Sequence, residues 1–567
     1  MKKTVSLILT VLMFFSIMAP VANAYVDYEA LPVIYIRGNG ETIYDEDGNE
    51  VTVDLDGLFA DDGEEGEDGE EGKNKIIEAC ANILLPFLTE GLIMDKWDNY
   101  GKAIYEELSP LFEKSHLDGN GDPKYGTCVS KTALAQSEAE AKKNKGTDNW
   151  YNFNDFAFCY DWRLSPYDHV ERLHEYVETV RANNGNKQVC LVARCFGGSL
   201  LTAYLEQYGH LGHVKKAVFS DVLSGGCTIV SKSFSGKIAF DDNSVQRYVR
   251  QLEQCGELGV GQGFVLTQLT SEIVNRTVDL FKQTTVLDSI TGGIEGLYDK
   301  LYQALIPAIC FASGIATQPN YWTCVYEEDF DQAFNLIFGE EGSEARTEYA
   351  GLIEKVVTYR ERVTADIDGL MLKFRDEYGI HIGIIGKYGY MNAPFTEGEK
   401  EPSDALVSLK DSTFGATCAD VGKKLTDSYI NSRIAENAEN AKYISPDKQV
   451  DLSTCLFPET TWIIKNIHHD YGGICEQITM DFFRSKKLTV DAGGAFPQFI
   501  MFDEKTETWR PMTEDDCADY EWLSTPVEEP TTESRIVSLM RWLTTIFNLI
   551  SMLIKGEISF NAFKEAI

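Results

Sequence analysis

The sequence predicts an α/β fold with a mainly parallel sheet, helices on both faces and an inserted helical segment. Three observations lead to this prediction. Short apolar runs typical of buried strands alternate with segments of helical periodicity in the first part of the chain. The stretch 188–208 runs from such a strand through a tight turn into a helix. From 227 to 378 only helical patterns follow one another, before a strand pattern returns at 378–385.

Five apolar runs mark expected strands of the sheet. They cover residues 31–36, 156–160, 189–192, 216–220 and 378–385. Helical spacing places helices over about 168–183 and 200–208, between consecutive strands. Strands that are joined through helices pair in parallel, and both faces of such a sheet are covered.

The tight turn between strand and helix has small residues two before and two after its central residue. It reads Ala193-Arg194-Cys195-Phe196-Gly197. Small flanks let the backbone turn sharply and hold the central side chain at the head of the helix, as in the nucleophile elbow of an α/β-hydrolase, where G-x-S-x-G is usual. Cys195 is therefore the predicted nucleophile. The alternative is a buried structural cysteine on an ordinary turn.

A thiol nucleophile needs a base, and the base needs a group that orients it. In α/β-hydrolases the chain order is nucleophile, acid, histidine. After Cys195, only His468 and His469 follow a plausible acid loop, and His469, farther from the preceding apolar segment, is the preferred base. The acid is expected after the strand that follows the helical segment, where Asp404 and Asp411 are candidates.

Two backbone N–H groups are expected to form the oxyanion hole. One belongs to Phe196, the residue after the nucleophile. The other is expected in the glycine-rich loop after the first strand, where position favours Asn39, which follows Gly38.

Several of these segments together resemble the lecithin:cholesterol acyltransferase family of lipases and acyltransferases. The order is the early strand and loop at 32–40, Y-D-W-R-L at 160–164, the elbow, and Asp404 followed by the late histidine. The family has a comparable Y-D-W-R segment before a G-H-S-x-G-G elbow, and its acid lies in G-D-G-T-V. The segment 403–407 matches that aspartate and valine, so the resemblance implies Asp404 as the acid.

The resemblance implies an enzyme that cleaves or transfers acyl groups of lipid-like esters. Because the elbow has Ala193-Arg194-Cys195 in place of Gly-His-Ser, the expected intermediate is a thioester. The same departure keeps an alternative open, a catalytically inactive binding protein on an α/β-hydrolase scaffold. The expected partner is a small-molecule or lipid acyl ester.

The first 24 residues have a charged start, an apolar middle and an Ala-x-Ala end, which predicts a secretory signal peptide and a secreted, extracellular protein.

The helical segment at 227–378 is expected to be a cap that covers the active site. The expected parts are a signal peptide (1–24), the first part of the hydrolase core (25–226, with an acidic insertion at about 43–74), the cap (227–378), the second part of the core (379–500) and a C-terminal extension (501–567, with an amphipathic helix at about 535–555).

Charge and cysteine content limit the partners and cofactors. A formal net charge of −38 argues against nucleic acid as a partner. The apolar C-terminal helix is a candidate for peripheral membrane contact. Thirteen cysteines in an exported protein predict disulfides, and the odd count leaves a thiol unpaired, for which Cys195 is the obvious choice. Without a Cys-x-x-Cys pair or a His/Cys cluster at metal-ligand spacing, we expect no metal and no cofactor.

Overall fold

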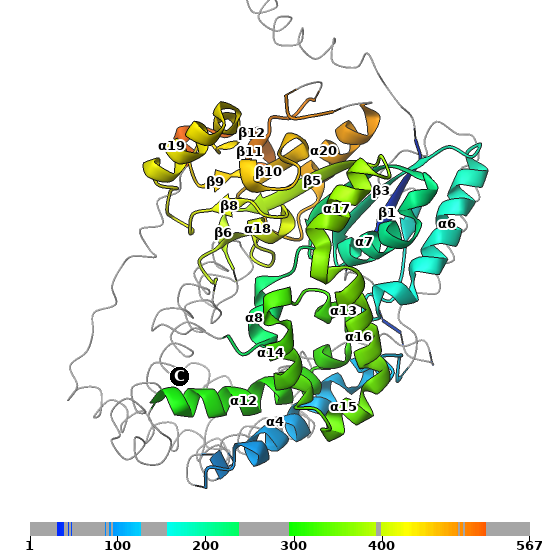
Figure 1. Ribbon diagram of the computed structural model, residues 1–567, viewed down its shortest axis with the longest axis vertical. Coiled ribbons are helices and arrows are strands. Elements are labelled where there is room, and N and C mark those ends of the chain that lie inside the picture. The colour runs from blue at the N-terminus through cyan, green and yellow to red at the C-terminus, as the bar shows by residue number, and fades with distance from the viewer. Residues whose placement is uncertain are drawn as a thin grey trace, which may run out of the picture.

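A twisted eight-stranded sheet lies at the centre of the described part of the chain in the computed structural model (Figure 1). The structure describes residues 31–38, 43–44, 47, 86, 90–91, 94–125, 156–237, 294–392, 398–485, 488–491 and 494–516. The strands stand in the order β12-β11-β10-β5-β4-β3-β1-β2. Their bounds are β1 Val33–Ile36, β2 Phe156–Phe158, β3 Val189–Cys195, β4 Val214–Val222, β5 His381–Tyr388, β10 Thr461–Lys465, β11 Phe499–Asp503 and β12 Thr508–Pro511. All neighbours pair in parallel except β11 and β12, so the predicted mainly parallel sheet is confirmed.

Helices cover both faces of the sheet, as predicted. Successive strand residues point to opposite faces, and in β3 Leu191 and Ala193 enter one core whereas Cys190 and Val192 enter the other. The first core is completed by α6 (Val170–Asn183), α7 (Gly197–Tyr208) and α17 (Ile367–Asp376). The second is completed by α20 (Gly473–Arg484). Burial on both faces explains why these strands appear in the sequence as continuous apolar runs.

The described part of the connection from β4 to β5 contains helices and no strand. They are α8 (Thr228–Phe234), α12 (Ile294–Ala312), α13 (Pro319–Trp322), α14 (Glu327–Phe338), α15 (Glu344–Glu348), α16 (Ala350–Arg362) and α17. All but α17 gather beyond one end of the sheet, and α4 (Trp97–Phe112) lies along α12 (Figure 1). A Cβ on Gly101 of α4 would lie 2.9 Å from the carbonyl oxygen of Ala304, so glycine permits this close approach. The group has its own aromatic core around Trp322.

The sheet continues past the boundary expected at residue 500. Strand β11 reaches Asp503, and β12 adds an antiparallel edge at Thr508–Pro511. All four residues of β12 are exposed. An edge strand without a buried face has no alternating apolar pattern, which is why the sequence did not indicate it.

Shorter elements fill the region between β5 and β10. They are β6 (Tyr390–Met391) paired with β7 (Pro402–Ser403), α18 (Leu409–Ser412), β8 (Thr417–Cys418) paired with β9 (Val450–Asp451), and α19 (Asp427–Glu436). The expected signal peptide, most of the acidic insertion, Asn39 and the expected C-terminal helix lie outside the described residues. Of the helices within the described ranges, none combines the length and apolar character needed to cross a membrane.

Candidate active site

Cys195 occupies a strained backbone position at the turn from β3 to α7. Its φ is 50°, in the left-handed region that a side chain rarely adopts. Residues are held in such conformations where the surrounding structure imposes them, commonly at active sites. The thiol-bearing residue is 5% exposed and stands at the head of α7. This is the strand–turn–helix geometry of a nucleophile elbow.

Glycines let the neighbouring backbone approach the elbow. A Cβ on Gly197 would lie 2.5 Å from the carbonyl oxygen of Ile36, and one on Gly38 would lie 2.7 Å from Cβ of Cys195. Neither position has room for a larger residue, because real Cβ contacts are not this short. The end of β1 and the loop after it are therefore packed directly against the turn that carries Cys195.

His469 lies between Asp404 and Cys195. Its Nδ1 is 2.7 Å from Oδ2 of Asp404, and its side chain also hydrogen-bonds the Cys195 thiol. The other carboxylate oxygen of Asp404 accepts hydrogen bonds from the backbone N–H groups of Leu406 and Val407, at 3.1 and 2.7 Å. Asp404 follows β7, and His469 lies on the loop between β10 and α20. The fold thus brings together the three residues expected from the sequence.

Electrostatics couple the buried histidine to the carboxylate. Burial acts to lower the pKa of His469, but Asp404 and Cys195 outweigh it, and this pKa is raised well above its usual value. Burial acts to raise the pKa of Asp404, but His469, Lys387 and the Val407 N–H hold it below its usual value. The folded state therefore favours an imidazolium beside an ionised carboxylate.

Replacing Asp404 with asparagine should destabilise the protein most between about pH 4 and pH 6.5. These limits are the unperturbed pKa values of an aspartate carboxyl and a histidine imidazole. Because the pKa of Asp404 is lowered on folding, its ionisation stabilises the folded state at pH values above the unfolded pKa of the carboxyl. This stabilisation is lost as the pH falls through the folded pKa. Because the pKa of His469 is raised on folding, its protonation stabilises the folded state at pH values below the unfolded pKa of the imidazole. This stabilisation is lost as the pH rises through the folded pKa of His469. Urea unfolding of both proteins from pH 4 to 9 measures the difference.

Asp411 provides the matched control for this measurement. Its carboxylate accepts a hydrogen bond from Tyr326 at 2.7 Å, and burial raises its pKa. Its ionisation therefore opposes folding, so Asp411→Asn should not show the same loss at pH 4 to 6.5. A destabilisation by Asp404→Asn that does not vary with pH would contradict the ion pair.

The structure separates the alternatives that the sequence left open. Asp404, not Asp411, contacts the histidine, because Asp411 faces Tyr326 and Thr228. Of the two adjacent histidines, His469 contacts both Asp404 and Cys195, whereas the ring of His468 lies 6.0 Å from that of Tyr390.

A buried ion pair below the histidine loop was not anticipated. Lys387 of β5 lies 2.9 Å from Asp221 of β4, and both side chains are fully buried. The Lys387 ammonium also donates to the carbonyl oxygens of His469 and Tyr471, each at 2.7 Å. Arg194 donates to the same His469 carbonyl at 2.8 Å, and its Nε lies 3.8 Å from Asp221. The arginine that replaces the usual elbow histidine thus helps to hold the loop that carries His469.

The Y-D-W-R segment positions an aromatic side chain beside the turn that carries Cys195. Asp161 and Arg163 form a buried two-point ion pair, with contacts of 3.1 and 2.9 Å. Between them, Trp162 stacks on Phe196 with 6.0 Å between ring centroids. Tyr321, between β4 and β5, packs edge-on against Phe196 at 5.1 Å. Aromatic side chains from two distant segments therefore pack against Phe196, the residue after Cys195.

The expected oxyanion donors are only partly described. Phe196 is the N-cap residue of α7, and the first N–H groups of a helix have no acceptor within the helix. Its N–H is therefore suited to bind a developing negative charge. The second expected donor, Asn39, lies outside the described residues, although the preceding Gly38 packs on Cys195.

Two further cysteines belong to the apolar cluster around Cys195. Cys227 and Cys324 lie in it, and burial raises the pKa of each well above its usual value. The described residues with free thiols include Cys227, Cys310, Cys324, Cys418, Cys455 and Cys475. The expectation of disulfides is therefore wrong for these six, all of which are buried except the half-buried Cys418.

The sheet, its helices and the elbow define an α/β-hydrolase. A comparison with protein families matches residues 141–238 to the family described as lecithin:cholesterol acyltransferase. The matched segment runs from before β2 to after α8 and includes the elbow. Over this segment the chain is similar to the lecithin:cholesterol acyltransferase family. Searches of curated proteins and of solved structures found no match.

Proposed function

We propose that the protein cleaves or transfers acyl groups of lipid-like esters through Cys195, His469 and Asp404. The observation that carries this proposal is the position of His469, whose side chain hydrogen-bonds both Cys195 and Asp404. A nucleophile, a base and an orienting acid in this relation form the common machinery of acyl transfer.

In the first step the Cys195 sulfur, whose proton has passed to His469, attacks the ester carbonyl. With Nδ1 of His469 held by Asp404 at 2.7 Å, Nε2 remains to exchange the proton. The tetrahedral intermediate collapses as the C–O bond breaks, and the imidazolium protonates the departing alkoxide. The acyl group is then bound to Cys195 as a thioester, and the alcohol leaves.

In the second step His469 removes a proton from water or from an acceptor alcohol, which attacks the thioester carbonyl. The C–S bond breaks, the sulfur recovers its proton from the imidazolium, and the acid or the new ester leaves. In both steps the N–H of Phe196 is the proposed donor to the oxyanion, and one such donor is typically worth about 2.7–4 kcal/mol. Asp404 keeps the imidazole in the orientation that both proton transfers require.

The helices between β4 and β5 are proposed to act as a cap over this site. Tyr321 packs on Phe196, and Cys324 shares an apolar cluster with Cys195. Apolar and aromatic surroundings suit an acyl chain better than a charged substrate.

We further propose that the protein is exported, since its first 24 residues have the pattern of a signal peptide. We also propose that its C-terminal helix supports peripheral membrane contact.

The test is hydrolysis and transfer of esters and thioesters of graded acyl length by the wild type, His469→Ala and His468→Ala. We expect wild-type turnover, a loss of about 10³-fold or more in His469→Ala, and little change in His468→Ala. The adjacent histidine is the matched control because it lies on the same loop. Alkylation of Cys195 by iodoacetamide should slow only in His469→Ala.

Two outcomes would overturn the proposal. Turnover that survives His469→Ala would remove this histidine from the chemistry. Saturable lipid binding without turnover in the wild type would favour the inactive binding protein on an α/β-hydrolase scaffold. That alternative predicts the same ligand class but no difference between the two histidine variants.

A further inference from the structure

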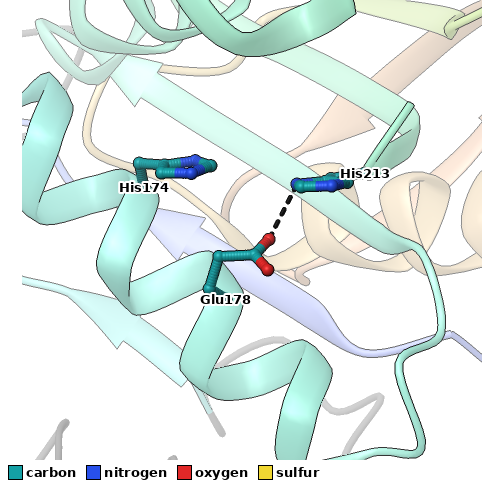
Figure 2. A group of neighbouring side chains, drawn as sticks. All are labelled: His174, Glu178 and His213. Atoms are coloured by element: carbon teal, nitrogen blue, oxygen red, sulfur yellow. Dashed lines mark ion pairs between the residues drawn. The ribbon is translucent and has the colours of Figure 1, made fainter. Parts of the chain in front are cut away.

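Two histidines and a glutamate come together at the end of the sheet opposite Cys195 (Figure 2). His174 and Glu178 lie on α6, and His213 directly precedes β4. One possible ligand atom from each lies within 4.8 Å of the others. Strands β3 and β4 are parallel, and Cys195 ends β3 whereas His213 stands before the start of β4. The group is therefore remote from the acyl-transfer site.

Local structure explains why the three side chains meet. His174 and Glu178 are four residues apart on α6 and so share one face of the helix. The backbone of His213 is fixed by a hydrogen bond of 2.9 Å from the N–H of Val189 to its carbonyl oxygen. The His174 ring stacks on Tyr208 at 3.9 Å and lies nearly parallel to the His213 ring, 6.0 Å away. Packing therefore holds both imidazoles in place.

The ring nitrogens of this group have unmet bonding capacity. Nδ1 of His174 and Nδ1 of His213 are buried and have no hydrogen-bond partner among the described residues. His213 Nδ1 lies 2.7 Å from Oε1 of Glu178, but the contact lacks the alignment of a hydrogen bond. Buried polar atoms are normally paired, so exceptions require an explanation. A ring nitrogen and a carboxylate oxygen that lie close together without a hydrogen bond are expected where both are ligands of one metal ion.

We propose that His174, Glu178 and His213 bind a divalent transition metal, with Zn²⁺ as the preferred ion. Two imidazole nitrogens and one carboxylate oxygen suit Zn²⁺ and leave a fourth position for water. Ca²⁺ and Mg²⁺ prefer oxygen ligands alone. Arg181 donates to Glu178 Oε1 at 2.6 Å and would orient the carboxylate, as the outer hydrogen bonds of metal ligands do.

The proposed ion would join α6 to the start of β4. A ligand that binds only the folded state raises stability in proportion to the logarithm of its concentration, and a metal whose ligands come from separate elements acts in this way. The effect should appear in thermal unfolding and not in the chemistry at Cys195. The sequence alone did not indicate this site, because His213 is distant from the His174–Glu178 pair along the chain.

The experiment uses the full-length protein, freed of metal with EDTA, with its thiols blocked by iodoacetamide so that cysteines do not bind the ion. Zn²⁺ is titrated by calorimetry, and thermal unfolding is followed with and without Zn²⁺. We expect one Zn²⁺ per chain and a rise in Tm that EDTA reverses. His174→Ala and His213→Ala should each weaken Zn²⁺ binding at least tenfold and abolish the rise in Tm.

His210→Ala is the matched control, because this histidine is exposed in the turn just before His213. It should retain the wild-type affinity and the rise in Tm. If His213→Ala does not fold, Glu178→Gln tests the same site at a more exposed position and should also weaken binding. The proposal is overturned if the wild type binds no Zn²⁺, or if the folded site variants bind it as tightly as His210→Ala does.

Discussion

Replacing Cys195 with alanine is expected to abolish acyl-ester turnover, with a loss of about 10⁴-fold or more. The substitution removes the sulfur that would carry the acyl group, so no thioester can form. Mass spectrometry of the wild type, quenched during turnover of a slow ester, should show an acyl adduct on Cys195, and the alanine variant should show none. Full turnover by Cys195→Ala would rule out the covalent mechanism.

Two control variants separate the nucleophile from its surroundings. Cys195→Ser keeps a polar atom of similar shape at the elbow, so it should fold and show activity between that of the wild type and that of Cys195→Ala. Cys227→Ser changes a neighbouring buried thiol whose raised pKa keeps it protonated. This variant should retain turnover and the adduct on Cys195. Equal loss in Cys227→Ser would instead indicate that the whole cluster is required for folding.

Breaking the buried pair of Lys387 and Asp221 should cause a large loss of stability. Lys387→Met leaves the Asp221 carboxylate buried without its nearest cation, and such a loss typically costs about 3–5 kcal/mol in the free energy of unfolding. It also removes three hydrogen bonds to the loop of His469. Protein that remains folded should therefore have a lower kcat, because Lys387 positions the base.

A double-mutant cycle provides the control for this second prediction. Asp221→Asn with Lys387→Met removes both charges, so the double variant should lose less stability than the sum of the single variants. Lys423→Met, which breaks an exposed pair with Asp420, should change stability little. Additive losses in the Lys387 cycle would mean that the two residues do not act as a pair. Chemical denaturation measures all of these variants.

The elbow was predictable because its cause is local. A buried strand, a turn with small flanks and a helix are each recorded in adjacent residues from 188 to 208. Asp404 and His469 were accessible only through chain order and the family resemblance, since nothing near either residue marks it as a partner of Cys195. The distinction between Asp404 and Asp411 required the fold, because both follow β5 and both are buried.

The supporting groups could not be predicted, because they depend on strands that meet only in the folded sheet. Lys387 and Asp221 are single charges within apolar runs, and each alone has no evident partner in the sequence. Their strands β5 and β4 are adjacent in the sheet but separated by the helical segment along the chain. A charge inside a buried strand was the available signal, since such charges are rarely tolerated unless paired. The exposed edge strand β12 offered no comparable signal.

The long connection between β4 and β5 also determines when Cys195, Asp404 and His469 can meet during synthesis. Cys195 is made before this connection, whereas Asp404 and His469 are made after it. Strand β5 cannot join the sheet until the ribosome has produced the whole crossover, and pairing across so long a loop is intrinsically slow. A nascent chain that ends within the crossover therefore carries Cys195 without His469. Synthesis order thus delays the contact of Cys195 with His469 until the second half of the sheet has assembled on the first.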